Sequence, residues 1–113
     1  MGTRGDAAEE LAAGFLQRAG LKLVERNYRC RFGEIDVIAR EGATLVFVEV
    51  RMRTSERFGG AAASITATKR AKLLRTARHY LAGVAQAPQC RFDALLVNGN
   101  DQSIEWLKNA FAE

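Results

Sequence analysis

The sequence is poor in the residues that most often build structural zinc sites and nucleophilic triads. It contains one histidine, His79, and two cysteines, Cys30 and Cys90, with no CxxC pair. A structural zinc site takes four Cys or His ligands and is therefore not expected. A Ser-His-Asp or Cys-His site would depend on His79 alone, which lies in a basic, helical stretch, so a catalytic triad is not expected either.

Long apolar runs are also missing. No segment approaches the roughly 18 apolar residues of a membrane span, and Met1–Asp6 has no apolar signal core. We therefore expect a cytoplasmic protein with no membrane partner and with reduced cysteines, although a disulfide between them stays open. The 113 residues, of which 48% are hydrophobic, suit a single domain over residues 1–113.

Acidic residues are absent from one long segment. Residues 57–91 contain seven basic residues and no acid, in a chain whose net charge is +4. A segregated basic segment is typical of a protein that binds a polyanion such as DNA or RNA. A solvated helix face that serves solubility is the alternative.

The hydrophobic periodicity predicts two helices and five strands. The expected elements are a helix over about 6–19, strands over 21–30, 33–39 and 46–51, a loop over 51–60, a helix over 66–81, and strands over 91–97 and 103–107. The second helix is expected to bury Ala67, Ala71, Leu74, Ala77 and Leu81, with Leu73 and Tyr80 beside them. The order αβββαββ favours an α/β fold in which helices flank a central mixed sheet.

The two central strands carry acidic residues where apolar residues are expected. If Gly42 is the first residue of a two-residue type II′ turn, Asp36 lies opposite Glu49 and Glu34 lies opposite Arg51. All four side chains then share one face, while Ile35, Val37, Val48 and Val50 share the other. Opposed carboxylates repel each other, and a Mg²⁺ ion between them would relieve the repulsion. The hairpin therefore predicts a metal site.

Several short motifs together resemble those of a known family. The motifs are Gly5-x3-Glu9, Gly33-Glu34-Ile35-Asp36, Phe47-Val48-Glu49-Val50-Arg51-x-Arg53, Phe58-Gly59-Gly60, Lys69, Arg91-Phe92-Asp93 and Glu105–Phe111. At this spacing, over nearly the whole chain, the sequence resembles the YraN-like family of small bacterial proteins. That family in turn is similar to the restriction-endonuclease-like, PD-(D/E)xK nucleases, including archaeal Holliday-junction resolvases.

The resemblance implies a three-layer nuclease fold and a role for particular residues. Asp36 and Glu49 match the two metal-binding acids of the nuclease motif, and Glu9 matches a third acid carried by a helix. Arg51 stands where the motif usually has a lysine. The implied cofactor is Mg²⁺ or Mn²⁺, and the implied partner is nucleic acid, DNA rather than RNA, with a homodimer as an open alternative. The candidate residues for nucleic-acid binding are Arg53, Arg57, Lys69, Lys72 and Arg75.

Arg51 separates three hypotheses. Arginine stays protonated and cannot act as a base, although it can orient a phosphate and stabilise its charge. The first hypothesis is a metal-dependent nuclease acting on DNA, including branched or structured DNA. The second is a nucleic-acid-binding protein that keeps the fold without efficient catalysis. The third is a structural role, with Glu34 paired to Arg51 and Asp36 accepting a backbone hydrogen bond.

Overall fold

The chain forms a three-layer α/β domain, seen in a computed structural model that describes residues 4–53, 66–86, 88–99 and 101–110. Its elements are α1 (Arg4–Arg18), β1 (Lys22–Cys30), β2 (Gly33–Glu41), β3 (Thr44–Arg53), α2 (Ala67–Leu81), β4 (Cys90–Asn98) and β5 (Ile104–Leu107). The order αβββαββ confirms the expected fold class and is compatible with a restriction-endonuclease-like core. No helix in these ranges is both long enough and apolar enough to cross a membrane.

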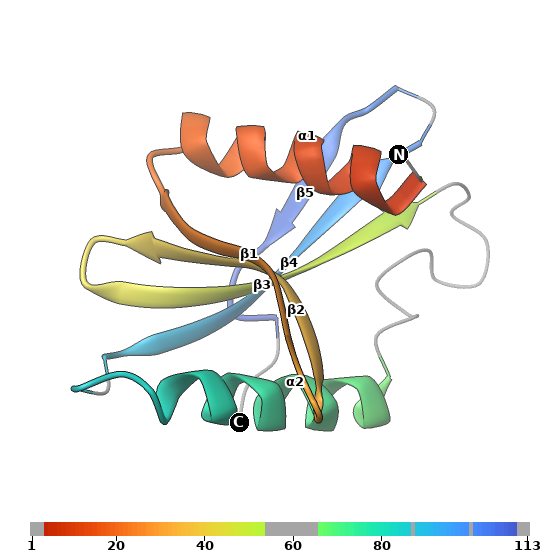
Figure 1. Cartoon of the computed structure of the whole chain (residues 1–113). Helices are drawn as coiled ribbons and strands as arrows, with labels where there is room; N and C mark the ends of the chain where they lie inside the picture. Colours follow the sequence, from red (N-terminus) through yellow and green to blue (C-terminus); the bar gives the residue numbers. More distant parts are fainter. Residues whose placement is uncertain (1–3, 54–65, 87, 100, 111–113) are drawn as a thin grey trace.

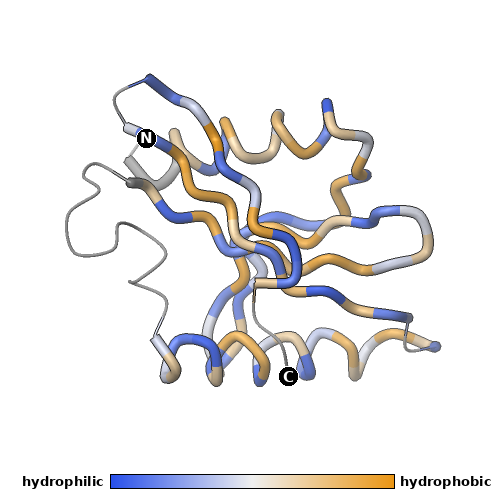
Figure 2. The backbone as a smooth tube through the Cα atoms, turned by 180° about the vertical axis from the view of Figure 1, so that it is seen from behind, coloured by the Kyte–Doolittle hydropathy of each residue, from blue (hydrophilic) through white to orange (hydrophobic). Residues whose placement is uncertain are grey.

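The five strands form one mixed sheet in the order β1-β2-β3-β4-β5. Only β3 and β4 run parallel, and α2 belongs to the crossover that connects them. The other neighbours are antiparallel. Figure 1 shows α1 on one face of this twisted sheet and α2 on the opposite face. In Figure 2 the central stretches of the strands are the most hydrophobic part of the backbone trace.

Each face of the sheet has its own hydrophobic core. Val46, Val48 and Val50 pack with Leu16 of α1, whereas Leu45 and Phe47 belong to the cluster that contains Leu73 of α2. Strict alternation along β3 produces this division, because neighbouring side chains point to opposite faces. The same alternation places Glu49 and Arg51 on the α2 side of the sheet.

Local sequence signals determine where the elements end. Gly20, with φ 97°, follows α1, and Leu21 N–H donates to the Leu16 carbonyl, which closes the helix in a Schellman motif. Gly42, with φ 60°, lies in a two-residue turn in which Glu41 pairs with Thr44, as the type II′ prediction requires. Thr66 caps α2 by accepting a hydrogen bond from Lys69 N–H.

Three expectations about these elements were wrong. The strand β3 continues to Arg53, so the expected loop does not begin at Arg51. In α2, Ala67 and Ala71 are exposed, and the buried residues are Leu73, Thr76 and Ala77. The buried stripe of α2 is rotated toward Thr76 because the β1–β2 turn packs against the helix there.

The third wrong expectation concerns β2, whose alternation breaks at Asp36. Ile35 belongs to the α2-side core, although Val37 belongs to the α1-side core, so the two do not share a face. Opposite Asp36, Asn27 of β1 has φ 54°, in the left-handed region. The β1–β2 hairpin bends at this point, and its tip crosses α2 (Figure 1).

Gly33 permits the close approach of the hairpin tip to α2. Its φ is 149°, and a Cβ placed there would lie 3.1 Å from Thr76 Oγ1. Thr76 has no exposed surface, and its hydroxyl donates a hydrogen bond to the Lys72 carbonyl. The helix therefore offers little room for a larger residue at this contact.

We expect Gly33→Ala to lower the free energy of unfolding by about 1–3 kcal/mol, because it adds both backbone strain and a steric contact. Urea unfolding followed by circular dichroism measures the change. The matched control is Gly83→Ala, whose Cβ would lie at an ordinary 3.7 Å from the Tyr80 carbonyl. Equal stabilities for the two variants would contradict this account of Gly33.

Candidate active site

A cleft of about 680 Å³ opens where the bent hairpin, the end of β3, the start of α1 and the first half of α2 meet. Its charged lining residues are Glu9, Arg29, Glu34, Asp36, Glu49, Arg51, Lys69 and Lys72. Acids and bases are thus equal in number among these side chains. They come from five different elements, so the cleft exists only in the folded chain.

Asp36 is the buried acid of the cleft. Its side chain is at the boundary of β2 and β3, and Asp36 Oδ2 accepts a 2.8 Å hydrogen bond from Val50 N–H. Burial, the nearby Glu49 carboxylate and a side-chain hydrogen bond with Glu49 raise the pKa of Asp36 from 3.8 to about 7, although the Val50 hydrogen bond opposes this. The two carboxylates are therefore close neighbours, and their repulsion favours the protonated form of Asp36.

The predicted register of β2 and β3 holds near the Gly42 turn but ends one residue before Asp36 and Glu49. Pairing of β2 with β3 runs from Glu41 opposite Thr44 to Val37 opposite Val48. Beyond that point β2 bends away, and neither expected strand pair, Asp36 with Glu49 or Glu34 with Arg51, is formed. Proximity of Asp36 to Glu49 persists because the bend carries the Asp36 carboxylate to the Val50 amide, next to Glu49 in sequence.

Arg51 forms an ion pair with Glu49 in place of Glu34. Its Nη2 lies 2.6 Å from Glu49 Oε2, and 29% of the Arg51 side chain is exposed. Arg51 Nε is a buried donor without a hydrogen-bond partner within the described part of the chain. The guanidinium therefore neutralises one of the two acids and keeps a donor unused.

Glu34 instead pairs with an arginine that the sequence analysis did not select. Its carboxylate lies 3.6 Å from Arg29 Nε, and both side chains are largely exposed. The register of β1 and β2 places Arg29 opposite Glu34. Counting back from the Arg31-Phe32 turn would have shown this pair, but the sequence signal for that turn is weak.

Glu9 and Glu10 of α1 separate as their helical spacing predicts. Glu9 lines the cleft, whereas Glu10 forms a 3.1 Å ion pair with Arg26. Over the described ranges, no three His, Cys, Asp or Glu side chains are close enough to hold one metal ion together. Glu9 thus shares the cleft with Asp36 and Glu49 without completing a three-acid cluster.

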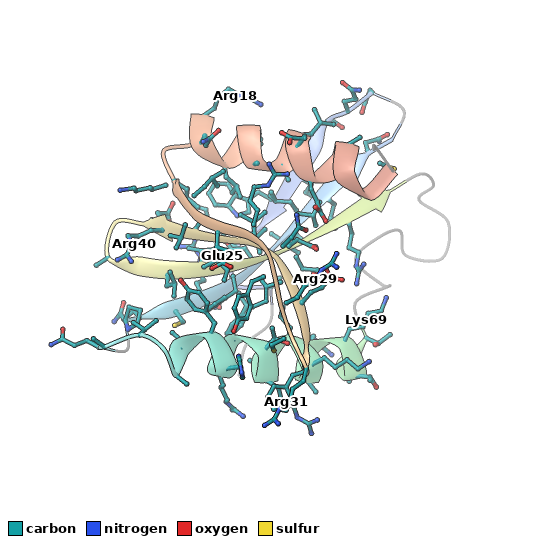
Figure 3. The ribbon with its side chains drawn as sticks, viewed as in Figure 1. Arg18, Glu25, Arg29, Arg31, Arg40 and Lys69 are labelled. Atoms are coloured by element: carbon teal, nitrogen blue, oxygen red, sulfur yellow. The ribbon has the colours of Figure 1, made fainter. Side chains whose placement is uncertain are left out.

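The predicted basic residues divide into two groups. Lys69 and Lys72 line the cleft from α2, whereas Arg75 is exposed on α2 outside it. Arg53 ends β3, opposite Asn98, and Arg57 lies outside the described residues. Figure 3 shows Arg29 and Lys69 on the same side of the hairpin, toward the start of α2.

Cys30 and Cys90 are thiols that are not joined in a disulfide, and Cys30 lines the cleft. The disulfide between them, which the sequence left open, is therefore not formed. Cys30 is half-buried and Cys90 is exposed near the start of β4.

These features define a class of protein: an α/β domain, compatible with a restriction-endonuclease-like core, with neighbouring acids on the strands β2 and β3. Residues 8–97 match the sequence profile described as "Uncharacterised protein family UPF0102". The chain therefore belongs to the UPF0102 family, which confirms the resemblance to YraN-like proteins.

Relatives from the genus Nitrosomonas illustrate the similarity. Two UPF0102 proteins of Nitrosomonas europaea are 64% and 62% identical over 113 residues, covering 99% of this chain and 96% of each relative. A UPF0102 protein of Nitrosomonas eutropha is 59% identical over 110 residues, covering 97% of this chain and 94% of the relative. The similarity thus extends over nearly the full length of this chain and of each relative.

Proposed function

We propose that this protein is a metal-dependent nuclease that hydrolyses phosphodiester bonds in DNA, including branched or structured DNA. The observation that carries the proposal is the Asp36–Glu49 pair, in which burial of Asp36 and repulsion by Glu49 raise the pKa of Asp36 to about 7. Strongly shifted acids in a cleft are typical of functional sites. Basic residues on the facing wall suit a phosphate backbone.

The acids in the cleft fit a hard divalent cation. Mg²⁺ is commonly held by one or two carboxylates, with waters and substrate phosphates as its other ligands. Asp36 and Glu49 would supply the two carboxylates, and Glu9 would face the same space from α1. When bound there, Mg²⁺ or Mn²⁺ would lower the pKa of a water and polarise a phosphoryl oxygen.

The basic residues would position the phosphate. Arg51 cannot accept a proton, so its role would be to donate hydrogen bonds to phosphate oxygens from the cleft floor. Lys69 and Lys72 would neutralise phosphates from the α2 wall. Deprotonation of the attacking water would then fall to a carboxylate or to solvent.

The proposal is tested by a cleavage panel of plasmid, flap, four-way-junction and linear duplex DNA. We expect cleavage with Mg²⁺ or Mn²⁺, and none after EDTA removes the metal, because the carboxylates alone cannot activate the water. Asp36→Ala should be inactive, whereas Glu25→Gln, an exposed acid outside the cleft, should cleave like the wild type. Cleavage that survives Asp36→Ala would indicate a contaminating nuclease and contradict the proposal.

Arg51 provides a second prediction. We expect Arg51→Ala to lower the cleavage rate by roughly 100-fold or more, the usual effect of removing one preorganised donor to a charged transition state. Arg51→Lys keeps a cation two residues after Glu49 and should retain most of the rate. Single-turnover cleavage assays measure both variants, and an equal loss in both would show that the guanidinium fork itself is required.

The Arg51–Glu49 ion pair favours one second candidate: a nucleic-acid-binding protein that keeps the fold without turnover. This candidate predicts salt-dependent DNA binding that weakens in Lys69→Ala and Lys72→Ala but not in Lys22→Ala, an exposed lysine outside the cleft. Binding without cleavage in the full panel would select it over the nuclease.

A further inference from the structure

The tip of the β1–β2 hairpin separates the cleft of Asp36 and Glu49 from a second hollow. On one side, Gly33 and Lys72 line the cleft. On the other side, Tyr28, His79, Tyr80 and residues 82–84 line a hollow of about 560 Å³. Lys72 and His79 are about 10 Å apart along α2, at 1.5 Å per residue. The two hollows are therefore close neighbours on one edge of α2.

The rings of Tyr28, His79 and Tyr80 line the second hollow, and the Phe32 ring adjoins His79. The Tyr28 hydroxyl is hydrogen-bonded to His79 Nδ1 at 2.7 Å, and the Tyr28 ring meets Tyr80 edge-on at 5.2 Å between centroids. The Phe32 ring at the hairpin tip lies 5.8 Å from His79. Phe32 is only half-buried and His79 is exposed, so these rings are not fully used by the core.

The surroundings of the rings are basic. The guanidinium of Arg31 lies 4.9 Å from the centre of the Phe32 ring, and Arg31 itself is exposed at the hairpin tip (Figure 3). The helix α2 that supports the rings contains Lys69, Arg70, Lys72, Arg75 and Arg78 and no acid. Cations interleaved with aromatic rings bind single-stranded nucleic acid, because cations track the backbone while rings stack on bases.

We infer that the second hollow holds an unpaired base of a nucleic-acid strand. A phosphate of the same strand enters the cleft of Asp36 and Glu49. The inference rests on the proposed function, because it takes the cleft as the place of the phosphate to be cut. Bases within a duplex stack on one another and cannot reach a ring on the protein surface unless they are extruded. The preferred substrate is therefore a nucleic acid with a single-stranded segment at the cut site.

The test measures binding in EDTA, where no turnover occurs, by fluorescence anisotropy. The probes are a fluorescein-labelled single-stranded DNA, an RNA of the same sequence and the matching DNA duplex. We expect the wild type to bind the single strand roughly tenfold or more tightly than the duplex, from stacking of one base. The RNA arm decides which sugar the site prefers.

Variants connect this preference to the rings. Phe32→Ala and His79→Ala should remove the preference and leave duplex affinity unchanged, and Phe32→Leu should do the same while keeping apolar bulk. Lys72→Ala should weaken binding of the single-stranded DNA and of the duplex equally. Val24 is an exposed apolar residue of β1 outside both hollows, and Val24→Ala should change the affinity for neither DNA. An abasic nucleotide placed at successive positions of the single strand should weaken binding to the wild type at one position. It should not change binding to Phe32→Ala at any position.

The outcomes separate this inference from the proposed function. Cleavage in Mg²⁺ with equal affinity for single strand and duplex, or with a preference that survives Phe32→Ala, overturns the inference alone. A ring-dependent preference for the single strand, without cleavage in either metal, supports the inference as a binding site and overturns the nuclease.

Discussion

Asp36→Asn should abolish metal-dependent cleavage and at the same time stabilise the metal-free protein at pH 8. Asparagine keeps an oxygen that can accept the Val50 N–H hydrogen bond, but it removes the charge that faces Glu49. Cleavage should fall by at least about 100-fold, because one of the two proposed metal ligands is lost. A functional group that costs stability is common at active sites.

The direction of the stability change follows from the raised pKa of Asp36. Between pH 3.8 and about pH 7, the folded protein holds a proton on Asp36 that the unfolded chain has already released. The stability contributed by this proton is present in full at acid pH and is lost as the pH rises through 7. At pH 8 the wild type therefore pays a penalty of up to about 4 kcal/mol, which Asp36→Asn avoids.

Thermal unfolding in EDTA at pH 5 and pH 8, together with the cleavage panel, measures both effects. We expect the stability gain of Asp36→Asn to be larger at pH 8 than at pH 5. In the wild type at limiting Mg²⁺, cleavage should increase as the pH rises through about 7, because metal ligands must be deprotonated. Loss of both cleavage and stability at pH 8 would instead assign Asp36 a purely structural role.

Asp93→Ala should cause the largest loss of stability in the chain. Asp93 has no exposed surface and accepts hydrogen bonds of 2.9 Å from Arg91 Nε and Nη2, Trp106 Nε1 and Asn109 N–H. These contacts attach β5 and the following turn to β4. Removing the carboxylate leaves the buried donors of Arg91 and Trp106 unpaired, which typically costs about 3–5 kcal/mol.

A double-mutant cycle makes this prediction sharper. Arg91 also pairs with Glu41 at 2.6 Å, so Arg91→Ala should destabilise the protein as well. The double variant should be less destabilised than the sum of the single variants. Each single variant leaves the remaining charge buried without its partner, whereas the double variant removes both charges. Urea unfolding measures all three, with Glu25→Ala as an exposed control that should change stability by less than about 0.5 kcal/mol.

The structure also decides the role of Trp106. Trp106 packs edge-on against Phe15 at 5.8 Å and joins the α1-side core. It therefore does not serve as a free platform for base stacking. The aromatic residues with exposed surface are instead at the hairpin tip and on α2, where the sequence showed only a short turn and a basic helix.

Much of the fold could be predicted from the sequence, because its signals are local. Gly20, Gly42 and Thr66 mark helix ends and a turn through their own backbone preferences, and β-branched runs indicate strands. The wrong expectations arose where distant segments meet. The buried stripe of α2 depends on the hairpin tip that packs on Thr76, and the length of β3 depends on its pairing with β4.

The candidate site divides in the same way. The two-residue turn at Gly42 determined the register as far as Val37 opposite Val48, one residue short of Asp36 and Glu49, and helical spacing separated Glu9 from Glu10. Only the tertiary structure decided that Arg51 pairs with Glu49, that Arg29 pairs with Glu34, and that Lys69 and Lys72 close the cleft from α2. The physical reason is the bend at Asp36: strand alternation is a local rule, whereas the bend depends on the hairpin tip being held against a helix far along the chain.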